Sequence, residues 1–239
     1  MKKIIAAVLV SSLGLMACNT TPSVIPNSQV RFVNTVQDST GVNIFFGEDK
    51  INGTTPVPFK NSFPSATTYR TVVSGTLAYR MCLDDLYTCT KPSETIALGG
   101  DKLTSVFLLG TKSATDDTGV NARPIEIISA VTDTAAPASG KIKIRVLHTA
   151  TLPAANMVDI YITAPQDNLA GLPPQLSYKG IYDYRELAAG SYRIRATAVG
   201  VTSTALVDSD TLTLEAGKVY TAVITNPENG KGVILLTDK

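Results

Sequence analysis

The sequence has 239 residues, of which 21 are Lys or Arg, 20 are Asp or Glu and one is His. This balance excludes the strongly basic proteins that bind nucleic acid through charge, and neither half departs from it. Residues 29–132 carry nine basic and ten acidic side chains, and residues 141–239 carry ten and nine. The length suits two domains of about 100 residues better than one minimal core.

The first 17 residues have the pattern of a secretory signal peptide. Lys2 and Lys3 precede an apolar run from Ile4 to Leu13, which is too short for a comfortable membrane-spanning helix. Leu15-Met16-Ala17-Cys18 then resembles the cleavage site of a bacterial lipoprotein, at which the cysteine accepts lipid. We therefore expect acylated Cys18 to anchor the chain to membrane lipid, because two or more acyl chains bind a bilayer stably. An ordinary signal peptide followed by a coincidental cysteine is the alternative.

Residues 18–28 form a polar, proline-bearing tether between the lipid and the first domain. Position 19 is Asn rather than Asp. By analogy with lipoprotein sorting in Gram-negative bacteria, this indicates the outer membrane if the protein comes from such a bacterium. The predicted location is therefore the cell envelope.

Short β-strands are predicted from residue 29 onward. In residues 29–132, apolar and β-branched runs alternate with turns rich in Gly, Pro, Asn and Asp. Residues 133–140 have no hydrophobic period and read as a linker. Residues 141–239 repeat the strand order at a spacing of about 113 to 116 residues, without an amphipathic helix of ten or more residues. The pattern predicts an all-β fold of two tandem, immunoglobulin-like antiparallel β-sandwich domains behind a cleaved signal peptide.

Four segments of the second repeat follow one pattern in order: Ile144 to Ala150, Val158 to Tyr161, Leu187 to Tyr192, and Leu214 to Thr221. This order resembles the bacterial family catalogued as domain of unknown function 4397. The resemblance covers residues 141 to about 226 well and residues 29–110 weakly, where Asn34 replaces the histidine and Asn43 the aspartate. It implies exported or surface-associated β-sandwich domains, often in tandem and often lipid-anchored, and it implies no established catalytic activity.

His148 and Asp159 are the first polar residues to test for function. No G-x-S-x-G motif accompanies the single histidine, and one imidazole is too few ligands for a typical metal site. Since Asn34 holds the matching place in the first repeat, we expect His148 to make a local structural hydrogen bond. Asp159 is expected to bond a neighbouring loop or strand, and a carboxylate in a binding or acid–base pair is the alternative.

Two acidic segments and one glycine-flanked lysine superficially suggest ligand sites. Asp208-Ser209-Asp210 and Asp116-Asp117 lack the Gly and distal Glu of an EF-hand loop, so Asx turns are expected there. Gly230-Lys231-Gly232 lacks the rest of a phosphate loop and predicts a turn. No metal site and no cofactor are predicted.

Two groups of basic residues define a possible polymer-binding surface. Lys141, Lys143 and Arg145 lie on one face of their predicted strand, and Arg193 and Arg195 on one face of theirs. If the two strands share a sheet, five cations meet an anionic polymer or lipid headgroups. A solvated outer face that discourages edge-to-edge aggregation is the alternative.

Five tyrosines are candidate platforms on which a sugar ring could stack: Tyr69, Tyr79, Tyr182, Tyr184 and Tyr192. Tyr79 and Tyr192 recur at equivalent places in the two repeats, so both are expected to anchor the cores.

Cys82 and Cys89 are predicted to form a disulfide bond, because export favours oxidation and the third cysteine, Cys18, is consumed by lipid. Asp84-Asp85 is a plausible turn between them. By strand phase Cys82 matches Arg195, an outward position, so we expect a staple on a projecting hairpin rather than a core bridge. A two-thiolate metal half-site is the alternative.

The sequence thus predicts a lipid-anchored, non-catalytic protein of the cell envelope that presents tandem β-sandwich modules to an unknown envelope protein or polysaccharide. Binding of a carbohydrate or anionic polymer is the alternative. An enzyme is disfavoured because no nucleophile–base pair or ligand cluster emerges. Residues 141–239 are expected to fold alone, with the linker at residues 133–140 sensitive to proteases.

Overall fold

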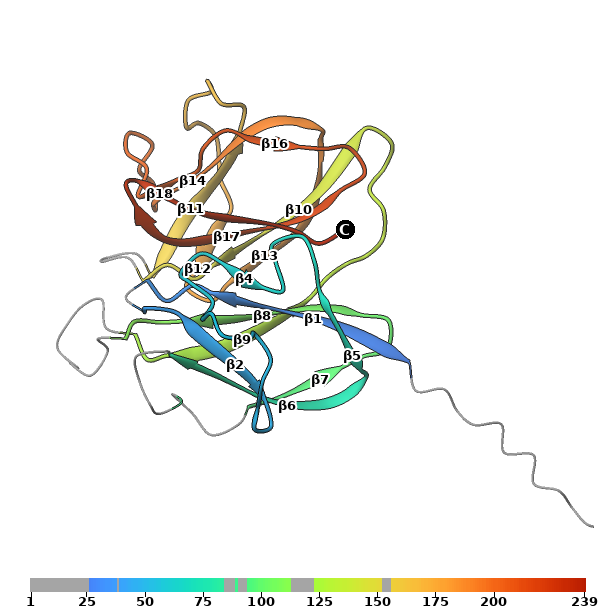
Figure 1. Cartoon of the computed structure of the whole chain (residues 1–239). Coiled ribbons are helices and arrows are strands. Elements are labelled where there is room, and N and C mark those ends of the chain that lie inside the picture. The colour runs from blue at the N-terminus through green and yellow to red at the C-terminus, as the bar shows by residue number, and fades with distance from the viewer. Residues whose placement is uncertain (1–25, 38, 84–88, 90–93, 113–122, 152–155) are drawn as a thin grey trace, which may run out of the picture.

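The computed structural model describes residues 26–37, 39–83, 89, 94–112, 123–151 and 156–239 (Figure 1). These residues form 18 strands and no helix, which confirms the predicted all-β class. Consequently, the described part of the chain contains no helix long and apolar enough to cross a membrane. The first strand begins at Asn27, so the last two residues of the predicted tether already belong to the sheet.

The first unit is a sandwich of two sheets. Its inner sheet has the order β4-β1-β8-β9, with β5 also paired to β1, and its outer sheet has the order β3-β2-β6-β7. The inner strands are β1 (Asn27–Asn34), β4 (Ser62–Phe63), β5 (Arg70–Val73), β8 (Leu103–Leu109) and β9 (Glu126–Val131). The outer strands are β2 (Val42–Phe46), β3 (Asp49–Lys50), β6 (Gly75–Leu83) and β7 (Glu94–Leu98).

The second unit is built from strands in the order β12-β11-β14-β15-β18-β17-β10-β13, with β16 also paired to β14. A single bridge between Asp208 and Lys231 joins the two halves of this order. One half comprises β11 (Met157–Thr163), β12 (Gln175–Ser177), β14 (Gly190–Ala198), β15 (Val207–Asp208) and β16 (Leu212–Leu214). The other comprises β10 (Lys141–His148), β13 (Ile181–Ala188), β17 (Val219–Glu228) and β18 (Lys231–Thr237).

The two units repeat one topology. Neighbouring strands are antiparallel except for the parallel pairs β1–β8 and β10–β17 and the single β15–β18 bridge. Arg31 lies opposite Ser105 in the first parallel pair, and Arg145 lies opposite Thr221 in the second. The internal repeat seen in the sequence is therefore also a repeat of register.

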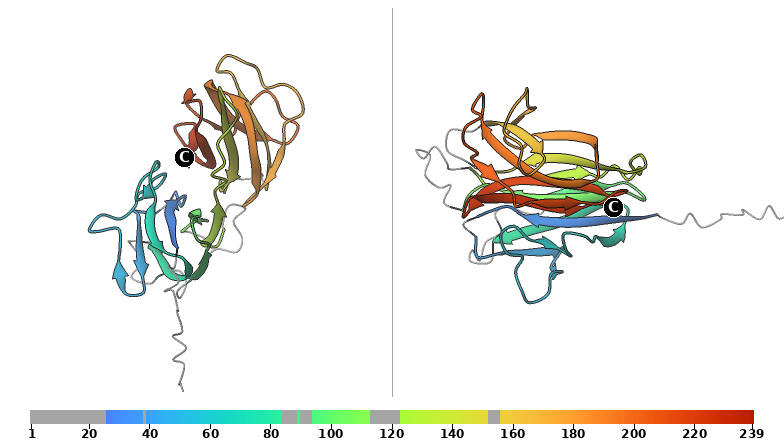
Figure 2. Two further views of the ribbon diagram at one scale, coloured as in Figure 1. Left: turned by 90° about the vertical axis from the view of Figure 1, so that its right-hand side faces the viewer. Right: turned by 90° about the horizontal axis from the view of Figure 1, so that it is seen from above.

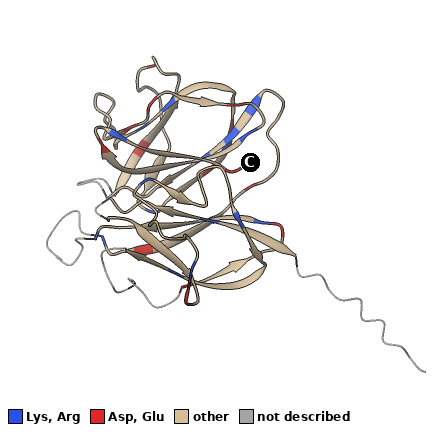
Figure 3. Ribbon diagram, viewed as in Figure 1, with Lys and Arg blue, Asp and Glu red and all other residues tan. Residues whose placement is uncertain are grey.

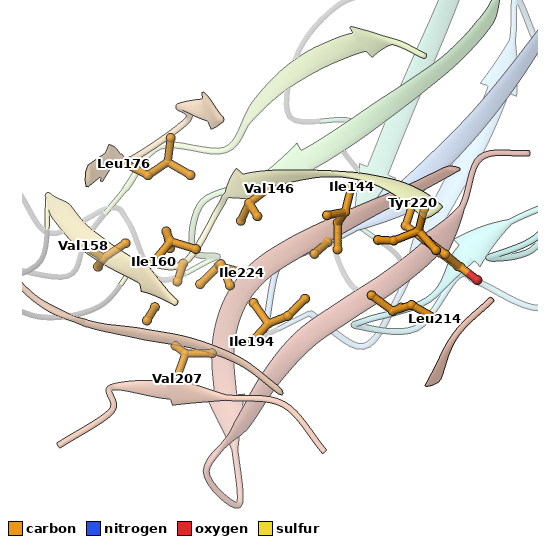
Figure 4. Packing of buried hydrophobic residues seen from close by; sticks show 14 residues of the cluster. Ile144, Val146, Val158, Ile160, Leu176, Ile194, Val207, Leu214, Tyr220 and Ile224 are labelled. Atoms are coloured by element: carbon orange, nitrogen blue, oxygen red, sulfur yellow. The ribbon is translucent and has the colours of Figure 1, made fainter. Parts of the chain in front are cut away.

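Each sandwich encloses its own apolar core. Alternate residues of β1 and β8 point into the first core, among them Val30, Phe32 and Val106. In the second unit, side chains from β10, β11, β14 and β17 meet between the two halves of the sheet order (Figure 4). Ile144, Ile160 and Ile194 lie at the centre of this packing, and each is at most 2% exposed.

A third apolar cluster joins the two units. The β1-β8-β9 face of the first sandwich lies against the β10-β17-β18 face of the second, and the two units form adjoining lobes (Figures 1 and 2). The buried members of this cluster are Val33, Phe107, Leu109, Ala130, Leu147, Val223, Ile234 and Leu236.

The central strands are therefore buried on both faces. Residues 106–109 of β8 and 219–225 of β17 are buried without a break. Continuous burial of this kind is typical of strands covered on both sides, whereas a strand with a free outer face would alternate between buried and exposed residues. Each large aliphatic side chain buried in this way contributes about 1.5–3 kcal/mol.

Candidate functional sites

The most completely buried charges lie between the two units. Arg31 Nη2 donates to Asp238 Oδ1 at 2.5 Å, and both side chains are 0% exposed. Arg31 Nη1 also donates to the carbonyl oxygens of Ala66 and Thr237, at 2.9 and 3.0 Å. The Tyr69 ring lies 4.3 Å from the guanidinium carbon. The guanidinium of the first unit is thus held by the last strand of the second.

Asp238 accepts hydrogen bonds from both units. Tyr69 Oη donates to Oδ1 at 2.8 Å, and Tyr184 Oη and Thr221 Oγ1 donate to Oδ2 at 2.9 and 2.5 Å. With Arg31, four donors therefore converge on one carboxylate. A buried charge is tolerated where it is paired and its lone pairs are bonded, and Asp238 meets both conditions.

Arg145 occupies the equivalent place on the other side of the interface. Its Nε donates to Thr221 Oγ1 at 2.8 Å, and its Nη1 to the Val131 carbonyl at 2.7 Å. Its Nη2 lies 3.4 Å from Thr132 Oγ1, and the guanidinium carbon lies 4.8 Å from the Tyr184 ring. Each arginine therefore reaches the end of the last strand of the opposite unit.

This exchange gives the interface an approximate twofold relation. The amide of Thr132 donates to Leu103, the first residue of β8, and the amide of Asp238 donates to Val219, the first residue of β17. Thr132 and Asp238 are thus equivalent, but only one of them carries charge. Because the network is buried between the units, its hydrogen bonds and ion pair hold the two units together.

The tyrosines of this network remain protonated donors at neutral pH. Burial, reinforced by the Asp238 carboxylate, raises the pKa of Tyr69 and of Tyr184 above the ordinary value of 10.0. Their contribution to stability is therefore fully present below pH 10.0 and is lost as the pH rises further.

The basic residues of β10 do not form the expected outward stripe. Arg145 is 4% exposed and lies between the units, because β10 is a central strand of the contacting sheet. Lys141 pairs with Glu186 at 3.7 Å, and Lys143 pairs with Asp133 at 2.8 Å. The prediction that Arg145 lies on an outer face was therefore wrong, and the two lysines have nearby carboxylates.

Arg193 and Arg195 lie on β14, which is not a neighbour of β10 in the sheet order. Arg193 Nε donates to Asp208 Oδ1 at 3.2 Å, and its Nη2 pairs with Oδ2 of the same carboxylate. Arg195 is 8% exposed. Figure 3 shows both signs of charge interspersed over the two units. The five cations are consequently not brought together on one surface.

His148 and Asp159 are both buried, at 0% and 3% exposed. The His148 imidazole lies edge-on to the Tyr178 ring, with centroids 6.2 Å apart. In the first unit, the equivalent Asn34 Nδ2 donates to the Val57 carbonyl at 3.0 Å, while its Oδ1 accepts from the Val36 amide. Asp159 Oδ2 accepts from the amide of Gly200 at 2.7 Å, which confirms the predicted bond to a neighbouring loop.

The side chains of the acidic segment Asp208-Ser209-Asp210 contact other residues of the second unit. Asp208 pairs with Arg193, Asp210 lies 3.2 Å from Lys231, and Ser209 Oγ accepts from the Ile194 amide at 2.9 Å. Asp116-Asp117 lies outside the described residues. Within the described ranges, no three His, Cys, Asp or Glu side chains are grouped so as to hold a metal ion. Gly230 lies in the β17–β18 turn, where Asn229 and Gly230 both have positive φ.

Cys82 and Cys89 form the predicted disulfide bond. Cys82 points away from the first core, which takes Tyr79, Met81 and Leu83 from the same strand. The residue is nevertheless only 5% exposed. Cys82 therefore points to the outer side of its strand, as predicted, but it is not exposed to solvent, because the bonded Cys89 covers it. The turn predicted at Asp84-Asp85 lies outside the described residues.

The candidate tyrosine platforms have structural roles. Tyr79 is 3% exposed in the first core, and Tyr192 packs against the second, as predicted. Tyr182 packs against the second core as well, while Tyr69 and Tyr184 belong to the interface network. The predicted leader at residues 1–17 and Cys18 itself lie outside the described residues.

Two hollows open beside strands of the second unit. One, of ≈ 420 Å³, lies beside the start of β17 and is lined by Thr67 of the first unit together with Thr213, Glu215, Lys218, Tyr220, Leu235, Thr237 and Lys239. The other, of ≈ 440 Å³, is lined by Asn168, Leu169, Arg195, Thr202, Ser203, Ala205 and Asp208. Both volumes are in the range of small-molecule sites. Arg195, which lines the second hollow, was predicted instead as part of a polymer-binding surface shared with the basic residues of β10.

Sequence reasoning did not identify the interface network. Tyr69, Arg145 and Tyr184 were named for other roles, and Arg31, Ser105, Thr221 and Asp238 were not named as site residues. One signal pointed to the network: an arginine between two apolar neighbours at the equivalent position of each repeat, Arg31 and Arg145.

Comparison with curated protein sequences found no match. Among solved structures, a family 26 carbohydrate-binding module of Eubacterium rectale Amy13K in complex with maltoheptaose aligns at 12% identity. The alignment covers 89% of this chain and 97% of that one, with a TM-score of 0.26. A leucine-rich repeat protein of Bacteroides thetaiotaomicron aligns at 12% identity over 83% of this chain and 26% of its own, with a TM-score of 0.21. TM-scores this low carry no argument about fold or ligand.

The comparison with family models identifies a family over most of the chain. The family model described as "Domain of unknown function (DUF4397)" matches residues 28–161 and 150–239, two overlapping copies that together span nearly all of the described chain. The chain therefore belongs to the DUF4397 family.

Proposed function

We propose that this protein is a lipid-anchored, non-catalytic interaction module of the cell envelope. Acylated Cys18 holds one end of the paired sandwiches near the membrane, and the opposite end faces an envelope partner. The signal-like leader and Leu15-Met16-Ala17-Cys18 support the anchor. The observation that carries the orientation is the direction of β1, which enters the inner sheet at Asn27 and ends at Asn34.

The geometry separates a near end from a far end. The nine residues from Cys18 to Pro26 span at most about 30 Å when fully extended, so Asn27 stays close to the lipid. The eight residues of β1 then carry the chain about 26 Å away from that point. The loops that follow β1 and the β17–β18 turn therefore lie at the end remote from the anchor.

Both units contribute to the far end. Lys60 Nζ donates to the Lys231 carbonyl at 2.7 Å and to Glu228 Oε2 at 3.2 Å. Gln37 Nε2 approaches the Pro227 carbonyl at 3.5 Å. These contacts fix loops of the first sandwich against the β17–β18 turn, so that a partner would meet one composite surface.

Anchoring is tested by Cys18→Ser, which should abolish acyl labelling and release the protein from membranes. Membrane retention of this variant without acyl labelling would sink the anchor assignment. Orientation is tested with a photo-crosslinking residue at exposed Asn229, with exposed Lys218 at the near end as the matched control. We expect a discrete protein adduct in intact envelopes from position 229 and none from position 218. Equal adducts from both positions, or an adduct from position 218 alone, would contradict the proposed orientation.

The alternative function, binding of a carbohydrate or anionic polymer, is supported by one observation, the hollow lined by Arg195 and Asp208.

A further inference from the structure

The second hollow of the second unit has a buried cation at its wall. It lies where β14 and β15 meet the loops at residues 164–174 and 199–206, and its volume is ≈ 440 Å³. Arg195, which lines it, is 8% exposed, so nine-tenths of this side chain is already removed from water. Its desolvation cost has been met in the protein before any ligand arrives.

The hydrogen-bonding capacity of Arg195 is only partly used. Its Nη2 donates to Thr163 Oγ1 and, at 2.8 Å, to the Asp167 carbonyl. Its Nε is buried and makes no hydrogen bond to any residue of the described chain. A buried donor left without an acceptor destabilises the fold, and a charged donor does so more than a neutral one. The guanidinium of Arg195 therefore keeps hydrogen-bonding capacity that no residue of the described chain uses.

The charge of Arg195 is also uncompensated by its hydrogen-bond partners. The nearby Asp208 carboxylate is engaged by Arg193 through Nε, at 3.2 Å, and through Nη2. Among described residues, the hydrogen-bond partners of Arg195 are a hydroxyl and a carbonyl, both neutral. The three side chains of Arg193, Arg195 and Asp208 together carry one net positive charge beside the hollow. The missing acceptor is thus expected to be an anion.

The remaining lining favours a polyhydroxylated ligand. Asn168, Thr202 and Ser203 supply an amide and two hydroxyls, each of which both donates and accepts hydrogen bonds. Asp208 adds a carboxylate that accepts from ligand hydroxyls and disfavours a multiply charged phosphate. Leu169 and Ala205 are the apolar contributions, and they are small for the side-chain pocket that a peptide usually needs.

We propose that this hollow is a binding site for a carboxylate-bearing sugar unit of the hexuronate type. The sugar carboxylate pairs with the guanidinium of Arg195, while the ring hydroxyls bond Asp208, Ser203 and Asn168. This inference rests on the alternative function, carbohydrate binding, and names its ligand class. It is independent of the lipid anchor and of the far-end partner surface.

The test compares two ligands that differ at one carbon. The mature chain in detergent is titrated with methyl β-glucuronide and with methyl β-glucoside, which replaces the carboxylate by a hydroxymethyl group. The readouts are calorimetry and the NMR signal of the Arg195 Nε–H. No aromatic ring lines the hollow, so we expect a dissociation constant on the order of 1 mM for the glucuronide. The glucoside should bind at least about 10-fold more weakly, because it loses a charge-assisted hydrogen bond.

Three variants separate binding from folding. Arg195→Gln should weaken glucuronide binding at least about 10-fold, and Ser203→Ala, at an exposed position, a few-fold. Lys218→Gln, in the other hollow, is the matched control and should leave binding unchanged. If Arg195→Gln does not fold, Ser203→Ala and the Nε–H signal of the unaltered chain still decide the matter.

Several outcomes would overturn the proposal. Equal binding of both glycosides would remove the role of the carboxylate. Acetate, phosphate or a peptide with a free terminal carboxylate binding as tightly as the glucuronide would remove the sugar. Absence of binding at 50-fold above the expected dissociation constant would remove the site. None of these outcomes affects acylation of Cys18 or crosslinking at Asn229, so failure here is distinct from failure of the anchored interaction module.

Discussion

Arg31 and Arg145 occupy equivalent positions in two copies of one fold, yet they meet different chemistry. Arg31 binds the carboxylate of Asp238 directly. Arg145 reaches it only through Thr221, which accepts from Arg145 Nε and donates to Asp238 Oδ2. Thr132, the equivalent of Asp238, offers Arg145 a hydroxyl. The two units therefore share a strand pattern but differ in the charges around the equivalent arginines. The single carboxylate of Asp238 compensates both buried guanidinium groups, one directly and one through Thr221.

The largest effect should follow from removing one copy altogether. A fragment of residues 141–239 exposes the face that carries Leu147, Val223, Ile234 and Leu236. Uncovering these four side chains forfeits about 1.5–3 kcal/mol each. We expect the fragment to fold and to dimerise through this face, with Arg145 of each copy bonding Asp238 of the other. Sedimentation velocity should give a dimer, and the full chain should unfold in one transition.

The fragment experiment needs a variant that breaks the new contact. Leu236→Glu should make the fragment monomeric, whereas a change at exposed Lys218 should not. A wild-type fragment that is folded and monomeric at high concentration would show that this face is stable without a cover. An unfolded fragment would show that the second sandwich depends on the first.

Loss of the single carboxylate should have the next largest effect. Asp238→Ala leaves Arg31 buried without a counter-charge, and breaking a buried pair in this way costs about 3–5 kcal/mol. Denaturant unfolding of the full chain measures the loss. Asp238→Asn should cost less, because it offers Arg31 a neutral acceptor, as Thr132 does for Arg145.

Glu228→Ala is the matched control for this prediction. Glu228 pairs with Lys60 across the same interface, but its side chain is 53% exposed. Exposed pairs contribute about 0.2–1 kcal/mol, so the change should be small. Equal losses from Asp238→Ala and Glu228→Ala would mean that the buried carboxylate has no special part in the contact.

The disulfide bond is a difference between the two units whose loss should have an intermediate effect on stability. Cys82 and Cys89, seven residues apart, are found only in the first unit. Replacing both by Ser should lower the free energy of unfolding by about 2–3 kcal/mol in the chain-entropy model. Hydrogen exchange should quicken in β6 and β2 and stay unchanged in β14. Free thiols in the exported protein, measured by mass spectrometry without reductant, would contradict the bridge.

The smallest effect is expected when a residue of the second unit is replaced by the residue that the first unit has at the equivalent position. Gln29 of the first unit corresponds to Lys143 of the second, which lowers the pKa of Asp133 by donating to it. A lowered carboxyl pKa stabilises the fold above the ordinary value of 3.8, and that stabilisation is lost as the pH falls through the lower folded value. Lys143→Gln should therefore cost about 0.2–1 kcal/mol at neutral pH and nothing in strong acid. A loss that persists unchanged in acid would rule out the ion pair as its cause.

The sequence predicts the strands well and their neighbours poorly. The alternation in β14 and the turn at Gly190 are visible in the sequence, because both depend on local chemistry. The strands on either side of that turn do not pair with each other, since β13 pairs with β10 and β14 with β11. The contact between the two sheets depends on pairs such as Arg31 and Asp238, which are 207 residues apart. Arg145 illustrates the difficulty, since a cation in an alternating strand is ordinarily solvated, and only the opposite unit reveals that it is buried. The hollow beside Arg195 likewise depends on loops whose path no periodicity specifies.

Asp238 also fixes when the molecule can finish folding. Both apolar cores can begin to form once their own strands are available, but the guanidinium of Arg31 pairs with a residue more than 200 positions later in the chain. Until then the β1-β8-β9 face is a nascent, uncovered surface that chaperones can recognise. An exported chain truncated before β18 should thus remain bound by such factors, whereas the chain that includes the last strand should be released.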